Sequence, residues 1–225
     1  SFSFFATAEA ISAVGANPIL VDIDPETYLI NTELIEKEIN PNTKAIMPVH
    51  LFGNAVNMNL INSLANKYGL KVIEDCAQAT CTMWETSKVG SIGDIGCFSF
   101  FPTKNLGAAG DGGAVTTSNA TIAKKIRELA VHGSPLRYHH TQIGYNSRLD
   151  TIQAAVLNIK IKYISKWVNS RQKIAKNYFD LLEKNSFISL PKISSDRISH
   201  SWNQFVIKLK NEQYDLFKDY SNIFE

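Results

Sequence analysis

The stretch IGCFSFFPTKNLGAAGDGG, residues 95–113, decides the fold class of this chain. It opens with an apolar run over 95–101 that is typical of a buried strand, and a second strand is predicted over 113–117. The glycine-rich segment from Gly107 to Gly113 has neither the GxGxxG order of a dinucleotide fold nor the Gly-Lys-Ser/Thr ending of a P-loop. We interpret it as a tight, close-packed turn between the two strands.

Strands and helices alternate on both sides of this stretch. Short apolar runs predict further strands over 18–22, 44–49 and 70–73. Amphipathic stretches with capping residues and glycine stops predict helices over 4–14, 32–39, 57–68, 119–131, 149–169 and 170–184. Such alternation predicts an α/β fold with a mixed, mostly parallel sheet and helices on both faces.

Polar side chains that could take part in catalysis or ligand binding follow three of the predicted strands. His50 follows 44–49, Asp75 follows 70–73, and Lys104 follows 95–101. Ligands in parallel sheets gather beyond the carboxyl ends of the strands, so these residues are expected at one edge. Lys104 has apolar and aromatic neighbours that would depress its pKa. His50 is expected to be a packed, hydrogen-bonded residue.

Composition bounds the class of protein. The chain has 225 residues and a net charge of +2, which indicates no nucleic-acid or membrane surface. The three cysteines form neither a CxxC pair nor a zinc spacing, so we expect no metal site and reduced thiols in a cytoplasmic protein. Because the chain starts without methionine and ends within an ordered-looking region, we expect it to be part of a longer polypeptide.

Six segments together resemble the DegT/DnrJ/EryC1/StrS family of sugar aminotransferases. They occur in the family's order and extend from Ser1 to about residue 190; beyond that, a strand over 201–206 still fits. The segments are SFSFFATAEAI (1–11), VDIDPETY (21–28), TKAIMPVHLFG (43–53), VIEDCAQA (72–79), GSIGDIGCFSFFPTKNLGAAGDGG (90–113) and GYNSRLDTIQAAVL (144–157).

The resemblance implies roles in binding pyridoxal 5'-phosphate (PLP). Lys104 matches the Schiff-base lysine, which also acts as the catalytic acid and base. Asp75 matches the carboxylate that pairs with the pyridine nitrogen, and Gln78 matches a residue near the cofactor's phenolic oxygen.

Three further positions match family residues around the cofactor. Phe4 matches an aromatic that stacks on the pyridine ring, and Ser99 matches a phosphate-binding hydroxyl. Asn146 matches a phosphate contact from the neighbouring subunit, which implies a homodimer with shared active sites. From the residues alone, core packing remains an alternative for Phe4 and Ser99, and capping of the following helix remains one for Asn146.

The resemblance also implies an architecture and a reaction. It predicts the large domain of a fold-type-I PLP-dependent transferase over 1–168, without its N-terminal phosphate-binding segment, and an incomplete C-terminal small domain over 169–225. The implied reaction moves an amino group, by family expectation from glutamate, onto a nucleotide-linked keto-sugar. Within the family, the chain looks most like members that aminate C3 of the sugar. The alternatives are a PLP-dependent sugar dehydratase, whose relatives carry histidine at the position of Lys104, and a non-catalytic regulatory member.

Overall fold

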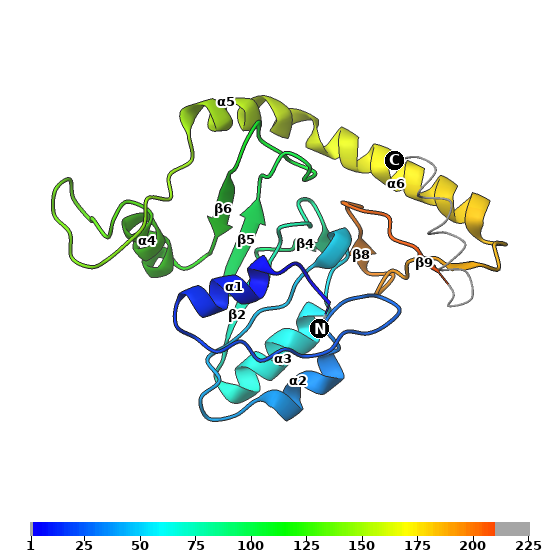
Figure 1. Cartoon of the computed structure of the whole chain (residues 1–225), viewed down its shortest axis with the longest axis horizontal. Coiled ribbons are helices and arrows are strands. Elements are labelled where there is room, and N and C mark those ends of the chain that lie inside the picture. The colour runs from blue at the N-terminus through cyan, green and yellow to red at the C-terminus, as the bar shows by residue number, and fades with distance from the viewer. Residues whose placement is uncertain (1, 210–225) are drawn as a thin grey trace, which may run out of the picture.

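A four-stranded sheet organises the chain in a computed structural model that describes residues 2–209 (Figure 1). Its order is β1 (Ala45–Ile46), β2 (Lys71–Asp75), β5 (Ile95–Ser99) and β6 (Gly113–Thr116). The first three strands are parallel, and β6 runs antiparallel to β5. The predicted mixed, mostly parallel sheet is therefore confirmed, and the glycine-rich segment forms the connection from β5 to β6.

Helix α3 (Met58–Tyr68) covers one face of the sheet and is delimited by local sequence signals. The Asn57 side chain caps its start by accepting a hydrogen bond from the Leu60 N–H at 3.2 Å. Gly69 ends it with a φ of 65°, a left-handed conformation in which glycine carries no Cβ penalty. Helix α2 (Thr32–Glu38) packs on α3, so the predictions over 32–39 and 57–68 are confirmed.

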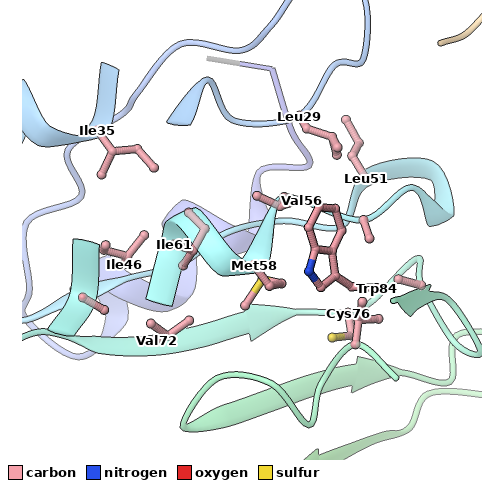
Figure 2. Packing of buried hydrophobic residues seen from close by; sticks show 14 residues of the cluster. Leu29, Ile35, Ile46, Leu51, Val56, Met58, Ile61, Val72, Cys76 and Trp84 are labelled. Atoms are coloured by element: carbon pink, nitrogen blue, oxygen red, sulfur yellow. The ribbon is translucent and has the colours of Figure 1, made fainter. Parts of the chain in front are cut away.

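The main hydrophobic core fills the space between these helices and the sheet. Figure 2 shows Ile35 of α2, Ile61 of α3 and Val72 of β2 in this cluster. All are buried, and each fully buried aliphatic side chain of this size contributes roughly 1.5–3 kcal/mol. The other labelled members are Leu29, Ile46, Leu51, Val56, Met58, Cys76 and Trp84.

A buried carboxylate closes the end of this core. Glu74 accepts hydrogen bonds from the backbone N–H groups of Gly90, Ile92 and Gly93 and from His50 Nε2, at 2.6–3.1 Å. His50 Nδ1 accepts from the Val56 N–H, which leaves Nε2 as the protonated donor. Burial alone would raise the pKa of Glu74, but these hydrogen bonds hold it below its ordinary value. His50 is thus a packed, hydrogen-bonded residue, as predicted.

The second face of the sheet is set by the pleat of β2. Val72 and Glu74 face the main core, so Asp75 points to the opposite face. The hydroxyl of Thr7 in α1 (Ala6–Ala13) donates to Asp75 there, which places α1 on that side. Helices therefore flank both faces, as predicted.

The C-terminal half begins with α4 (Ala120–Leu129) and continues along one end of the sheet (Figure 1). Helix α5 (Thr151–Lys160), a 3-10 turn (Ile161–Tyr163) and α6 (Ile164–Leu182) follow one another. The predicted break between 169 and 170 is wrong, because Ser170 Oγ bonds to the Lys166 carbonyl within a continuous helix. The predicted domain boundary at 168/169 falls inside α6 and stays a prediction.

Short strands form two further sheets, and the pairing of β3 with β8 joins the two halves of the chain. The hairpin of β3 (Met83–Trp84) and β4 (Ser87–Lys88) pairs with β8 (Ile198–Ser199), and β7 (Ile188–Ser189) pairs with β9 (Lys208–Leu209). Leu51–Gly53 forms a 3-10 turn. None of the helices within residues 2–209 combines the length and the apolar character that a membrane crossing requires.

Two predicted strands are wrong. Residues 18–22 have no ladder partner among the described residues, and Ile19 and Leu20 are exposed. The segment 201–206 is not a strand because Trp202 has a φ of 48°, which bends the backbone out of the extended region. The remaining predicted strands and helices are present with changed bounds. The helix predicted over 149–169 is interrupted by the 3-10 turn Ile161–Tyr163, whereas β2 and α6 are longer than predicted.

Replacing Glu74 by glutamine tests the buried carboxylate. The amide turns N–H donors toward backbone N–H groups, so we expect the free energy of unfolding to fall by about 3 kcal/mol at pH 7. The folded-state pKa of Glu74 lies below its ordinary value of 4.5, so its contribution is complete above that value and is lost as pH falls through the folded pKa. Urea denaturation across pH should show this difference shrinking in acid, with exposed Glu38→Gln as a neutral control; an unchanged stability would contradict the assignment.

Candidate active site

The predicted site residues gather where the parallel strands end. Asp75 is the last residue of β2, and Lys104 lies in the connection that follows β5. Because β2 and β5 are parallel and Asp75 pairs with Cys97, both connections start from the same edge of the sheet. The charge of Asp75 acts on the Lys104 amine, so the structure brings these two residues together.

The Asp75 carboxylate is held from two sides. Its Oδ2 accepts from the Thr7 hydroxyl at 2.8 Å, and its Oδ1 accepts from the backbone N–H of Ala77 at 3.0 Å. Each carboxylate oxygen can accept more than one hydrogen bond, so both retain capacity toward a ligand. Thr7 was missed by sequence reasoning, because a threonine in an alanine-rich helix carries no motif of its own.

Lys104 is half-buried, and its environment sets its acidity. Burial lowers the pKa of the amine, while the negative charge of Asp75 partly opposes that shift; the pKa ends below its ordinary value. A larger fraction of the amine is therefore neutral, and hence nucleophilic, than in a lysine surrounded by water. The backbone N–H of Lys104 donates to the Phe101 carbonyl at 2.9 Å, which fixes the turn before it.

The glycines after Lys104 allow close backbone packing. A Cβ added at Gly107 would lie 2.3 Å from the carbonyl oxygen of Pro102, and one at Gly113 would lie 2.8 Å from the Phe98 carbonyl. Hydrogen bonds from the Ala108 N–H to the Phe100 carbonyl and from the Phe100 N–H to the Gly112 carbonyl tie the connection together. The predicted tight turn is confirmed.

Gln78 supports the neighbouring 3-10 turn. Its Oε1 accepts from the backbone N–H of Phe52 at 2.6 Å, and Phe52 adopts an uncommon φ of 60°. The Phe52 ring packs with Tyr28 and Phe2 at centroid separations of 6.1 and 6.3 Å. Gln78 therefore links the end of β2 to the N-terminal segment that carries α1.

Phe4 and Ser99 occupy different environments. Phe4 lies two residues before the start of α1 and is 73% exposed, so the alternative of core packing is wrong for it. Ser99 ends β5 and is half-buried; its Oγ accepts from the Phe101 N–H at 3.3 Å, which leaves the hydroxyl hydrogen available. Ser99 and Cys97 alternate with Phe98, so they lie on the same face as Asp75.

Asn146 lies in the segment between α4 and α5, which extends away from the sheet (Figure 1). It is exposed, and its Oδ1 accepts from Arg148 Nε at 3.1 Å. With Arg148, Leu149, Asp150 and Thr151 it lines an open surface hollow. The capping alternative is wrong, because α5 begins at Thr151 with Asp150 at the N-cap.

His50, Glu74 and Cys76 place three potential metal-ligand atoms within 4.8 Å of one another. Both Glu74 oxygens and both His50 nitrogens, however, already make the hydrogen bonds described above. Burial, followed by the charge of Glu74, raises the pKa of the Cys76 thiol, which opposes the thiolate that a metal requires. We therefore assign this cluster to the core.

The chain matches the DegT/DnrJ/EryC1/StrS aminotransferase family over residues 1–221, and it belongs to that family. It is 47% identical over 209 residues to UDP-N-acetyl-3-dehydro-alpha-D-glucosamine 3-aminotransferase of Acidithiobacillus ferrooxidans. That match covers 93% of this chain and 56% of the relative, so the chain spans little more than half of the relative's length.

Two solved structures share the fold of this chain. DesV of S. venezuelae, in complex with a ketimine intermediate, matches with a TM-score of 0.93 and 35% identity over 98% of this chain and 59% of that chain. Ntda of Bacillus subtilis, with bound cofactor PMP, matches with a TM-score of 0.86 and 38% identity over 95% and 49%. The predicted fold-type-I PLP-dependent transferase architecture is thereby confirmed.

Asp75→Asn tests the electrostatic coupling at the site. Removing the negative charge leaves burial unopposed, so we expect the pKa of Lys104 to fall further. The pH dependence of Lys104 acetylation in the cofactor-free full-length protein, followed by peptide mass spectrometry, reports this shift. Asp111→Asn, in the exposed part of the glycine-rich turn, is the matched control; a Lys104 midpoint that stays constant or rises in Asp75→Asn would disprove the coupling.

Proposed function

We propose that this member of the family forms the cofactor-binding part of a PLP-dependent aminotransferase that acts on a nucleotide-linked keto-sugar. The observation that carries the proposal is the half-buried Lys104 amine, of lowered pKa, beside the anchored Asp75 carboxylate at the edge of a parallel sheet. An amine nucleophile paired with a carboxylate is the donor set that PLP requires.

The surrounding residues fit the cofactor. Lys104 would hold it covalently, and an Asp75 oxygen would accept a hydrogen bond from the ring nitrogen. Phe4 offers an exposed aromatic face for stacking, and the Ser99 hydroxyl has a free hydrogen to donate to a phosphate. Gln78 follows Asp75 by three residues, and we assign it to the phenolic oxygen side from the family resemblance. A relative with 38% identity binds PMP, which supports the same cofactor class here.

When bound, PLP supplies an electron-withdrawing ring that stabilises negative charge at the substrate carbon. The Asp75 carboxylate, oriented by hydrogen bonds from the Thr7 hydroxyl and the Ala77 N–H, would favour the protonated form of the ring nitrogen by accepting its hydrogen bond. When neutral and not attached to the cofactor, the Lys104 Nζ would serve as the base that accepts the proton from the substrate carbon and as the acid that gives it back during amino transfer. Burial favours this role, since a permanently charged ammonium cannot accept a proton.

We assign the sugar substrate to the class with a keto group at C3, and the amino donor to glutamate. The relative with 47% identity carries a 3-dehydro sugar linked to UDP in its name, which supports the first assignment. Glutamate rests on the family resemblance. Lys104 argues against a dehydratase, because the chain retains the amine that transamination needs. A non-catalytic regulatory role would not require a lysine of lowered pKa beside an anchored carboxylate.

We further propose a homodimer in which Asn146 completes the partner's phosphate site. Asn146 is exposed on a segment that extends from the body of the chain, and its neighbours line an open polar hollow. The three cysteines are free thiols, which supports a cytoplasmic location.

Cofactor attachment tests the catalytic assignment. Full-length protein mixed with PLP should gain a visible absorbance band, and borohydride should fix a pyridoxyl group on the Lys104 peptide. Lys104→Arg should lose both signals and the amino transfer, because its guanidinium stays protonated. Lys88→Arg, an exposed substitution distant in sequence, controls for non-specific modification. A wild-type protein without the band would favour the non-catalytic alternative.

Mixing two inactive variants tests the shared site. In a homodimer of Lys104→Ala or of Asn146→Ala, both active sites are defective. In the heterodimer of the two variants, one site carries both substitutions and the other site carries neither. Random exchange should therefore restore about a quarter of the wild-type amino transfer, as isologous symmetry requires. Measuring turnover before and after subunit exchange distinguishes the cases: absence of recovery would place Asn146 and Lys104 in the same subunit's site.

A further inference from the structure

The connection that carries Lys104 is anchored by polar side chains of α5. Gln153 and Lys160 are seven residues apart, about two helical turns, and so face the same side of the helix. Gln153 Oε1 accepts from the backbone N–H of Ala109 at 2.8 Å, and the Lys160 ammonium donates to the backbone carbonyl of Gly107. Both contacts fall within five residues of Lys104.

Asn105 anchors the same connection from a different direction. It is 6% exposed, and its Nδ2 donates to the Ser201 carbonyl at 2.9 Å. Ser201 is itself immobilised, because its N–H donates to the Gly53 carbonyl at 3.1 Å and its Oγ accepts from Thr82 at 2.7 Å. The residue next to Lys104 in sequence is therefore tied to a segment almost a hundred positions away.

Apolar packing joins the two anchors. Leu106 and Ala108, which alternate with the polar contacts, are buried against Leu157 of α5 and Ile164 of α6. The preceding turn lies so close to Gly107 that a Cβ added there would be 2.3 Å from the Pro102 carbonyl oxygen. Contacts from α5, from α6 and from the segment around Ser201 thus hold the backbone after Lys104.

Lys160 stands out among the lysines of this region. Its neighbour Lys162 is exposed to water, whereas Lys160 is half-buried and its ammonium lies 6.0 Å from the Trp167 ring centroid. A basic residue in a last helical turn commonly complements the helix dipole. The Lys160 ammonium instead donates a hydrogen bond to the carbonyl of Gly107, which lies outside α5 and three residues after Lys104.

We propose that Lys160 and Asn105 are positioning residues for Lys104, which fix the backbone after it against α5 and against the segment around Ser201. The inference rests on the proposed function of Lys104 and adds which residues set its place. Without either anchor, the turn gains freedom and the Lys104 amine gains contact with water. Its attack on an aldehyde then slows, because the amine is more often protonated and less often aligned.

Pyridoxal, which lacks the phosphate, probes Lys104 without help from the phosphate site. In cofactor-free full-length protein, we expect Lys160→Met to slow covalent attachment to Lys104 by about tenfold at pH 7. The midpoint of its pH profile should move up toward that of an ordinary lysine. Lys160→Arg keeps a charged donor and should restore both readouts in part, while Lys162→Met should match wild type.

A neutral variant separates position from charge. Among the described charged groups, Asp75 acts on the Lys104 amine, and none of these variants alters it. Asn105→Leu removes the hydrogen bond to the Ser201 carbonyl without changing any charge. It should therefore also raise the midpoint of the pH profile of pyridoxal attachment. The Asn105→Leu variant also keeps the proposal testable if the Lys160→Met variant fails to fold.

The results distinguish three cases. A raised midpoint and slower attachment in Lys160→Met or Asn105→Leu support the inference. Variants that lose thermal stability but keep the wild-type pH profile and rate overturn it, because the residues are then structural alone. A wild type in which pyridoxal never attaches to Lys104 overturns the proposed function, and the inference with it.

Discussion

The pleat of β2 is the constraint on which the rest of the structure depends. Glu74 and Asp75 are adjacent carboxylates, and a strand turns adjacent side chains to opposite faces. Glu74 is therefore buried in the core, where backbone N–H groups and His50 satisfy it, while Asp75 faces the site. A register shift of one residue would turn Asp75 into the core and Glu74 toward the candidate site.

The same division between core and site extends to the connection after β5. Its glycines allow the backbone to fold tightly, yet the place of the turn is decided by residues from the second half of the chain. The local sequence allows the turn to form, and contacts with residues distant in the sequence determine where it lies. This explains how a flexible composition such as Gly107 to Gly113 coexists with a fixed Lys104 backbone.

Much of the fold was predictable, because amphipathic periods and caps such as Asn57 and Gly69 act locally. The exceptions depend on tertiary partners: residues 18–22 have strand-like composition but no ladder partner among the described residues, and the positive φ of Trp202 leaves no trace in composition. Motifs singled out Lys104 and Asp75, and the structure brings them together. Thr7 and Lys160 were not predictable, since each acts through one contact that only the folded chain creates.

The balance of forces on Lys104 shows why the position of this lysine matters as well as its residue type. An ordinary lysine of pKa near 10.5 is neutral in roughly one molecule in three thousand at pH 7, too few for an efficient nucleophile. Burial shifts this balance toward the neutral amine, while Asp75 shifts it back. Both effects change steeply with depth, so a small movement of the turn alters them together. The anchoring of the turn is thus part of the chemistry that Lys104 can perform.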